Sequence, residues 1–365
     1  MEALDSILQK ALSLGATDIH IIVGQLPIYR IRRELVYDQS KLPMSKSTIL
    51  KIMEYFYENY PTLKDDFEED KQVDFTYSYM ENRFRINISL SKSNPTFSIR
   101  VIPNGSIKVR DLGLIDIINK MRTIQSGLIL VTGKINSGKT TTMNAFIQEV
   151  NKSDKKKIVT LEDPIEYEHI SQESVVIQKE IGKELDVKDY KSGLINLLRE
   201  DADIAVIGEI RDRETMDVAL DLAESGGLVV GTLHTRSCGE TLERILSLYD
   251  GSEKAAIKNT LSSVLKMVIS QKLIISKQNE LLMVPEIMMV NTVLAAIIRQ
   301  EKFNIGDIED SIHSQNDIGC VSFEQSFTDL YIRNLVDLKT IKENVDPERF
   351  KIIKNLIISS GVSLE

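Results

Sequence analysis

The sequence predicts an α/β protein with two domains, and two observations support this prediction. From about residue 112 onward, stretches of helical periodicity alternate with short apolar runs that lead to a Gly, Glu or His, namely 128–131, 158–161, 204–207 and 228–230. Strands that alternate with helices are typical of a largely parallel sheet covered by helices. The chain of 365 residues also suits two domains better than one, since domains usually contain ~100–200 residues.

The first hundred residues are predicted to form a smaller α+β domain. Apolar residues recur at helical spacing from Leu4 to Leu12, and a strand-rich stretch begins at Ile19. A further predicted strand, 97–102, stops at a Pro-Asn-Gly turn, and this turn opens the expected linker, 103–110. We therefore expect a first domain of residues 1–105 and a second of residues 106–365.

One strand of the first domain is expected to present two arginines on one face. Phe84, Ile86 and Ile88 alternate with polar residues that include Arg83 and Arg85. Because successive side chains of a strand point to opposite faces, the apolar residues pack inward and the arginines share the other face.

The second domain is expected to combine a core of about residues 112–275 with a mainly helical C-terminal region of residues 276–365. From about residue 255 to the end the pattern of apolar residues is mainly helical. The terminal third contains no obvious cluster of catalytic residue types, so the chemistry is expected in the core.

Composition and charge limit the classes of function. The net charge of −9 argues against a chain that binds nucleic acid through bulk positive charge. Cys238 and Cys320 lie far apart in no metal-binding spacing, which indicates a reducing compartment and no disulfide framework. The N-terminus lacks the pattern of a signal peptide, and Pro285 and Glu286 interrupt the longest apolar stretch, 281–298. We therefore expect a cytoplasmic protein that reaches a membrane only through partners.

A phosphate-binding motif lies at residues 133–140, which read Gly-Lys-Ile-Asn-Ser-Gly-Lys-Thr and fit G-x-x-x-x-G-K-[ST]. A strand-like run precedes the motif and helical spacing follows it. Gly133 and Gly138 let the backbone turn its N–H groups toward phosphate oxygens. Lys139 supplies positive charge near the β- and γ-phosphates, and the Thr140 hydroxyl can ligate Mg²⁺. The predicted nucleotide-binding residues are Gly133, Asn136, Ser137, Gly138, Lys139, Thr140 and Thr141.

Polar side chains follow three other predicted strands at the point where each strand ends. Glu162 follows one strand, Glu209 follows the next, and His234 follows a third. In an open parallel sheet, ligands bind beyond the carboxyl ends of the strands. A carboxylate there can activate the attacking water, and another can hold magnesium through water.

Several motifs resemble those of the secretion and type IV pilus motor ATPases, and they occur in the same order from about residue 1 to 345. The matching segments are 15–20 (N-terminal signature), 160–166 (acidic box), 198–201 with 207–212 (Walker B region), 231–235 (histidine box) and 269–273 (post-core helix). The long N-terminal extension and the four-cysteine zinc insert of the extension and secretion branches are not seen in this sequence. The chain therefore looks like the compact retraction ATPases of the PilT type.

The resemblance implies a PAS-like N-terminal domain, a RecA-like ATPase domain and a homohexameric ring with ATP between subunits. It makes Glu162 the general base for the attacking water, Glu209 the acid that supports Mg²⁺, and His234 a contact near the γ-phosphate. Arg83 and Arg100 match arginines of the N-terminal domain that can reach the phosphates bound by a neighbouring subunit.

The resemblance also implies the partners and the place of action. A motor of this kind works at the cytoplasmic face of the membrane, where it couples ATP hydrolysis to an inner-membrane pilus platform protein and to other pilus motor components. The expected output is pilus retraction and twitching motility, without direct contact to nucleic acid.

Three departures from the family pattern motivate alternatives. The phosphate loop reads Lys-Ile-Asn at 134–136 where the family usually has a proline, a small residue and a glycine. Gly227 stands where the histidine box normally begins with another histidine, and Ala295 replaces the first arginine of a helical motif associated with retraction. One alternative is therefore a weakly hydrolysing, nucleotide-binding ring subunit. A second alternative, a RecA-like nucleic-acid motor, is disfavoured because aromatic residues make up only 6% of the chain and tryptophan is absent.

Overall fold

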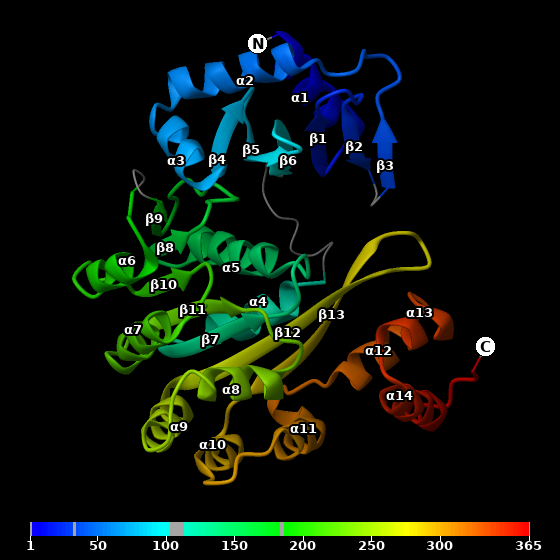
Figure 1. Cartoon of the computed structure of the whole chain (residues 1–365). Coiled ribbons are helices and arrows are strands. Elements are labelled where there is room, and N and C mark those ends of the chain that lie inside the picture. The colour runs from blue at the N-terminus through cyan, green and yellow to red at the C-terminus, as the bar shows by residue number, and fades with distance from the viewer. Residues whose placement is uncertain (1, 32–33, 103–112, 183–185, 365) are drawn as a thin grey trace. The chain divides into compact units, whose positions relative to one another are not determined.

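The computed structural model describes residues 2–31, 34–102, 113–182 and 186–364. These residues form two compact units (Figure 1). The first contains the described chain up to residue 102 together with Pro164–Glu168, and the second contains the remainder. The expected domain boundary and the linker 103–110 lie within 103–112, outside the described residues.

The first unit is built on a six-stranded antiparallel sheet in the order β3-β2-β1-β6-β5-β4. Its strands are β1 (Asp18–Ile22), β2 (Ile28–Ile31), β3 (Glu34–Tyr37), β4 (Gln72–Tyr79), β5 (Asn82–Ser91) and β6 (Asn94–Ile102). Its helices are α1 (Glu2–Leu14), α2 (Lys46–Asn59) and α3 (Thr62–Asp70). The predicted α+β character of this part is confirmed.

The core of the first unit follows from the two periodicities read in the sequence. In β5, Phe84, Ile86 and Ile88 are fully buried while the residues between them are partly exposed, as the alternation predicts. Helix α1 turns one apolar face inward because its buried residues recur three and four apart; they are Leu4, Ile7, Leu8 and Ala11. Both sets contribute to one continuous apolar cluster.

The second unit is built on a seven-stranded sheet in the order β13-β12-β7-β11-β10-β8-β9. Its strands are β7 (Gly127–Thr132), β8 (Lys157–Glu162), β9 (Val175–Glu180), β10 (Ile204–Ile207), β11 (Leu228–Leu233), β12 (Leu265–Ile275) and β13 (Leu281–Met289). All neighbours pair in parallel except β12 and β13, which form an antiparallel hairpin. The four predicted strands of the core and the predicted α/β class are confirmed.

Short polar side chains cap some of the helices of the core. The helices of the core are α4 (Ile115–Thr123), α5 (Lys139–Ser153), α6 (Tyr190–Leu197), α7 (Arg213–Glu224), α8 (Cys238–Leu246) and α9 (Glu253–Val264). Asp189, Asp212 and Ser237 accept hydrogen bonds from the first turns of α6, α7 and α8. Strands β7 and β11 are buried at every residue, as strands covered by helices on both faces must be.

The prediction of helix for residues 269–273 is wrong, and so is the mainly helical pattern expected from about residue 255 over the hairpin. The segment belongs to strand β12, and 281–289 forms strand β13. Short apolar runs do not distinguish a buried strand from a helix by periodicity alone. The segment forms a strand because it pairs with β7: Leu265 to Ser270 of β12 lie beside β7 and extend the parallel sheet.

The remainder of the C-terminal region is helical, as predicted. It contains α10 (Thr292–Arg299), α11 (Ile305–Ser314), a short 3₁₀ turn (Asn316–Ile318), α12 (Phe323–Ile332), α13 (Leu338–Asn344) and α14 (Pro347–Ser359). Phe323 and Phe327 of α12 pack with Ile353 and Ile357 of α14 against the β12–β13 hairpin. These helices therefore form a small core of their own at the hairpin.

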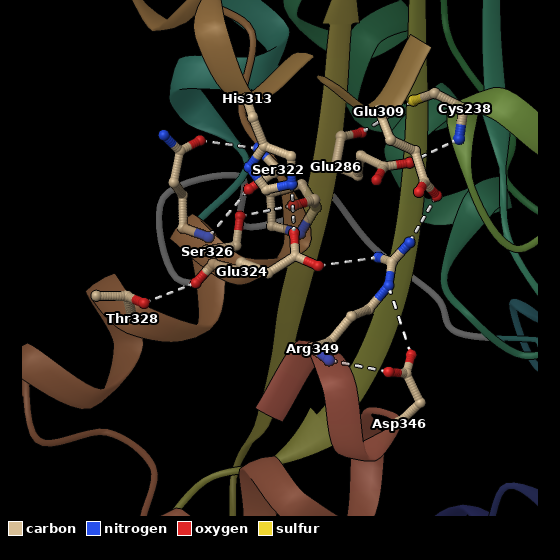
Figure 2. Close-up of polar contacts among 12 residues, drawn as sticks. Cys238, Glu286, Glu309, His313, Ser322, Glu324, Ser326, Thr328, Asp346 and Arg349 are labelled. Carbon is tan, nitrogen blue, oxygen red and sulfur yellow. Dashed lines mark hydrogen bonds and ion pairs between the residues drawn. The ribbon is translucent and has the colours of Figure 1, made fainter. Parts of the chain in front are cut away.

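Arg349 of α14 binds acidic side chains from three helical elements (Figure 2). Its guanidinium lies 2.7 Å from Glu309 of α11, 3.4 Å from Glu324 of α12 and 3.5 Å from Asp346, the N-cap of its own helix. Glu324 is only 2% exposed and also lies 3.4 Å from His313 of α11. These contacts hold α11, α12 and α14 together.

Glu286 of β13 is a second buried acid beside this cluster (Figure 2). Its Oε2 atom accepts a hydrogen bond of 2.6 Å from the N–H of Cys238, the first residue of α8. Burial raises the pKa of Glu286 to about 7, although the Cys238 N–H and the charge of Arg349 act in the opposite direction. Glu286 thus fixes the start of the helix that follows the predicted histidine box.

Both cysteines, Cys238 and Cys320, are buried and free. Among the described residues, no helix is both long and apolar enough to cross a membrane. The interrupted apolar stretch 281–298 forms strand β13 and helix α10.

Candidate active site

The predicted phosphate loop connects the end of β7 to the start of α5. Gly133, Asn136 and Gly138 have positive φ angles of 148°, 63° and 88°. Glycine adopts this backbone region at little cost, and asparagine tolerates it better than most residues. Helix α5 starts at Gly138 without a side-chain cap, so its first N–H groups point at the loop with the positive end of the helix behind them.

Lys139 lies inside the loop and is only 9% exposed. Its ammonium donates to the carbonyl oxygens of Gly133 at 2.9 Å and Lys134 at 3.2 Å, and it lies 3.1 Å from His234 Nδ1. Burial lowers the pKa of Lys139, and the charge of Glu209 opposes that shift. The side chain therefore places a positive charge in a partly dry position next to the loop.

His234 and Glu209 continue this line of contacts. His234 Nε2 lies 3.3 Å from Glu209 Oε1, and Arg211 Nη2 lies 2.8 Å from Glu209 Oε2. If Nδ1 accepts from Lys139, then Nε2 carries the proton and donates to Glu209, a tautomer assigned from the hydrogen bonds. Burial raises the pKa of Glu209, but Arg211 and His234 outweigh it and bring that pKa below its usual value. Glu209 is thus an ionised carboxylate at neutral pH.

Glu162 ends strand β8 and is 4% exposed. Its Oε1 accepts hydrogen bonds from the Thr160 hydroxyl at 2.7 Å and from the Gln178 amide at 3.0 Å. Thr160 lies opposite Gln178 in the β8–β9 pairing, so both donors come from the same face of the sheet as Glu162. The carboxylate is held in one orientation by its neighbours.

The parallel sheet brings the predicted groups to one edge. Strands β7, β11, β10 and β8 are consecutive neighbours and run in the same direction. The loop follows β7, His234 follows β11, Glu209 lies just after β10, and Glu162 is the last residue of β8. The Gly208 N–H donates to the Leu161 carbonyl at 2.8 Å and ties the last two strand ends together. The structure thus places the predicted residues of the core along one edge of the sheet.

Three residues at this edge were not predicted from the sequence. Arg211 and Gln178 bind the two carboxylates directly, as described above. Tyr190 is largely buried, and burial followed by the charge of Asp163 raises the pKa of its hydroxyl. The presence of Arg211 in the Walker B segment was a usable signal, whereas Gln178 and Tyr190 reach the site through the packing of β9 and α6.

The arginines of the first unit lie on the polar face of its sheet. Arg83 Nη1 contacts Glu168 at 3.1 Å, within the same unit, and its Nη2 lies 3.4 Å from the Thr76 hydroxyl. Arg100 contacts Asp18 at 3.2 Å and lies directly opposite Arg85 in the β5–β6 pairing.

Arg85 and Arg100 line a hollow of about 250 Å³ on this polar face, together with Asp18, His20, Asp74, Asn87, Ser98 and Ile99. Arg83 does not line this hollow. Arg85 was visible in the sequence as the second guanidinium of its strand, but only the register with β6 pairs it with Arg100.

The positions that depart from the family pattern lie in different surroundings. Gly227 precedes β11 while His234 follows it, so roughly 20 Å of strand separates them. Ala295 is 8% exposed on the inner face of α10. Asn136 keeps the loop's positive φ without a glycine.

The residues of the loop fit a nucleoside triphosphate with magnesium. The Ser137 hydroxyl is buried and makes no hydrogen bond within the described part of the chain, which suits a position where a polar ligand arrives. The Thr140 hydroxyl and the ionised Glu209 are oxygen donors, the type that Mg²⁺ prefers beside substrate phosphates. Among the described residues, no group of three or more His, Cys, Asp or Glu side chains could hold a metal ion by itself.

Comparison with known proteins gives consistent results. The sequence matches the family described as "Type II/IV secretion system protein" over residues 1–329. It is 32% identical over 338 residues to the "Type IV pilus retractation ATPase PilT" of Pseudomonas aeruginosa, which covers 92% of this chain and 96% of that protein. It is 33% identical over 272 residues to a "Twitching motility protein" of Neisseria gonorrhoeae, which covers 74% of this chain and 72% of that protein.

A solved structure agrees with the fold of both units. The structure described as "Crystal Structure of the Pilus Retraction Motor PilT and Bound ADP" superposes with a TM-score of 0.83 at 31% sequence identity. The alignment covers 94% of this chain and 97% of that chain. An ADP-binding protein therefore shares the architecture described above.

Proposed function

This chain belongs to the type II/IV secretion system protein family, and we propose that it is an ATPase motor that powers retraction of a type IV pilus. The observation that carries the proposal is the single sheet edge that holds the phosphate loop, His234, Glu209 and Glu162. Relatives named for pilus retraction and twitching motility, which align along most of the chain, support the biological role.

The loop residues bind the triphosphate in this proposal. Backbone N–H groups at the start of α5 receive the phosphate oxygens, and the Lys139 ammonium exchanges its loop carbonyls for the β- and γ-phosphates. Mg²⁺, when bound, neutralises charge on the β- and γ-phosphate oxygens. Thr140 and Glu209 would hold it. The full binding set is Gly133, Asn136, Ser137, Gly138, Lys139, Thr140 and Thr141.

Glu162 is the proposed general base. Its carboxylate accepts a proton from the water whose oxygen attacks the γ-phosphorus, while the bond to the β-phosphate oxygen breaks and ADP leaves. Thr160 and Gln178 donate to Glu162 Oε1 and so fix the direction of the carboxylate. His234 lies between Lys139 and Glu209, a position from which it can contact the γ-phosphate and relay a change there to the acid.

The proposed working form is a homohexameric ring in which neighbouring copies complete each site. Arg100 of the first unit, together with Arg83 or its neighbour Arg85, would offset charge on the phosphates held by an adjacent copy. Arg85 is the better partner of Arg100, because the two lie opposite each other and line the same hollow, which Arg83 does not line.

The proposed place of action is the cytoplasmic face of the membrane. There the ring would contact an inner-membrane platform protein and other pilus motor components, so membrane contact runs through partners. We assign no direct role to nucleic acid.

ATP hydrolysis by the purified chain tests the enzymatic part of the proposal. We expect release of phosphate that needs Mg²⁺ and that disappears in Lys139→Ala, because this substitution removes the charge that holds the phosphates. Tight ATP binding without hydrolysis, with Mg²⁺ and assembled rings, would instead favour the weakly hydrolysing ring subunit.

Complementation tests the biological part. In a bacterium that lacks its own retraction ATPase, the wild-type gene should restore twitching, and Glu162→Gln should not. Restored pilus assembly without retraction would contradict the proposed direction of the motor.

A further inference from the structure

Gln271 of β12 lies against the phosphate loop, although the role proposed above makes no use of it. The side chain is 2% exposed. Its Nε2 atom donates to the Ser137 carbonyl oxygen at 2.7 Å, and its Oε1 atom accepts from the Thr142 hydroxyl at 3.0 Å. One amide therefore joins the loop to the first turns of α5, using its donor for one and its acceptor for the other.

The backbone and side chain of Gln271 also occupy the space beside both glycines of the loop. A Cβ atom on Gly133 would lie 2.5 Å from the Gln271 carbonyl oxygen, and one on Gly138 would lie 3.2 Å from Gln271 Nε2. Both glycines already have positive φ angles. The loop thus needs glycine at these positions for close contact with β12 as well as for its backbone path.

The sheet sets the position of Gln271. In the pairing of β12 with β7, Ser270 lies opposite Thr132, the last residue of β7. Gln271 is the next residue, level with the point where the chain leaves β7 and enters the loop. A neighbouring parallel strand therefore delivers this amide to the loop.

The hydrogen bond to Ser137 has a consequence for the next N–H group. Ser137 C=O and Gly138 N–H belong to one planar trans peptide, so they point in opposite directions. When Gln271 holds the carbonyl on the β12 side, the Gly138 N–H is directed away from β12. The Gln271 amide thereby fixes the orientation of one of the backbone donors assigned to the phosphates.

We propose that Gln271 is a positioning residue that preorganises the phosphate loop for the nucleotide. The inference rests on the proposed function, because it assumes that the loop binds a nucleoside triphosphate. The two hydrogen bonds act before and during binding alike, so the residue should contribute mainly to nucleotide affinity and little to the chemical step.

Three variants separate the two hydrogen bonds. Gln271→Met keeps the length of the side chain and removes both bonds. Gln271→Glu keeps an acceptor for Thr142 but turns a carboxylate oxygen toward the Ser137 carbonyl. Thr142→Val removes only the bond to Oε1. Ser270→Ala is the matched control, since Ser270 is equally buried on the same strand and its hydroxyl makes no hydrogen bond within the described chain.

The measurement is the dissociation constant of ADP, together with KM and kcat for ATP, in the full chain with Mg²⁺. Since a net hydrogen bond is modest in strength, we expect Gln271→Met to weaken ADP binding and raise KM roughly tenfold, with kcat within about threefold. Thr142→Val should weaken ADP binding about threefold. Gln271→Glu should bind ADP no more tightly than Gln271→Met does. Ser270→Ala should match the wild type.

The outcomes distinguish this inference from the proposed function. If Gln271→Met binds and hydrolyses like Ser270→Ala, Gln271 has no positioning role. An equal loss of ADP affinity in all four variants would mean that Gln271 contributes only to general packing, and this would also overturn the inference. If Gln271→Met fails to fold, Gln271→Glu and Thr142→Val test the two hydrogen bonds separately, and unchanged ADP affinity in both variants overturns the claim. A wild-type chain that binds no nucleotide would overturn the proposed function first.

Discussion

The second unit contains acids with shifted pKa values in two regions, and their surroundings shift those pKa values in opposite directions. At the edge of the sheet, Arg211 and His234 bring the pKa of Glu209 below its usual value despite burial. Beside the C-terminal helices, burial raises the pKa of Glu286 to about 7, because its hydrogen bond to Cys238 and the more distant Arg349 do not compensate. The same side-chain type is therefore ionised at one place and close to half-protonated at neutral pH at the other.

The comparison separates a site from a structural cluster. Around Arg349, the acids of α11, α12 and α14 form ion pairs within the chain, and those contacts hold the helices together. At the sheet edge, Glu209 is linked through His234 to Lys139 of the phosphate loop, and Glu162 ends β8, the strand next to β10. Burial of an acid alone does not identify a catalytic residue; its position relative to the loop does.

The largest expected effect is on hydrolysis when an edge acid loses its charge. We expect Glu162→Gln to lower kcat about 1,000-fold, because a general base contributes about this much, while the midpoint of thermal unfolding changes little. Glu286→Gln is the same chemical change in the other region and should keep kcat within about threefold at pH 7. Phosphate-release kinetics and thermal unfolding of both variants check this contrast. Equal losses of activity would remove the distinction between the two regions.

A large effect on stability is expected from Arg349→Met. The substitution leaves the buried Glu324 and its neighbour Glu309 without their guanidinium partner, which should lower the free energy of unfolding by about 3 kcal/mol. Urea denaturation measures the change, and Lys351→Met on the exposed side of α14 serves as the control. A loss of less than about 1 kcal/mol would show that the cluster does not hold the helices.

Glu286 should make stability depend on pH. Its folded pKa of about 7 lies above the ordinary glutamate pKa of 4.5, so the folded state binds the proton more tightly. The stabilisation that protonated Glu286 gives the folded state is fully present below pH 4.5 and is lost as the pH rises through 7. Between these two pH values, the free energy of unfolding should fall by up to about 1.4 kcal/mol per pH unit. Glu286→Gln should remove this dependence on pH. Denaturation of the wild type and of Glu286→Gln at several pH values from 5 to 8 measures this dependence. If the free energy of unfolding changed with pH in the same way in both proteins, the raised pKa of Glu286 would be contradicted.

The smallest expected effect concerns Gly227. Because Gly227 lies at the opposite end of β11 from His234, Gly227→His should leave kcat and KM within about twofold. A Cβ atom there meets the Leu222 carbonyl at 3.4 Å, so the change should also fold. Steady-state ATPase kinetics measure it. A gain of tenfold or more would mean that this position influences the phosphate edge and that the departure from the family pattern limits turnover.

The parts that local sequence determines were predicted, and the parts that depend on pairing between distant segments were not. The loop and the residues after β8, β10 and β11 were predictable because each lies directly after an apolar run in a parallel sheet. Strand β12 was missed because its apolar run fits a helix as well, and only its pairing with β7 makes it a strand.

The same limit applies to single residues of the site. Gln178 reaches Glu162 because β9 pairs with β8, and Gln271 reaches the loop because β12 pairs with β7. On the first unit, the register of β5 with β6 places Arg85, rather than Arg83, opposite Arg100. None of these relations is encoded within one continuous segment, so the sequence offered the residue types but not their partners.

The most direct test of the central claim is specific ATPase activity across a series of protein concentrations, with Mg²⁺ and with Glu209→Gln in parallel. If the sheet edge is a working site completed by a neighbouring copy, specific activity should rise with concentration to a plateau, and Glu209→Gln should remain about 100-fold lower throughout. Hydrolysis that is negligible at every concentration, or that is the same in Glu209→Gln, would contradict the account.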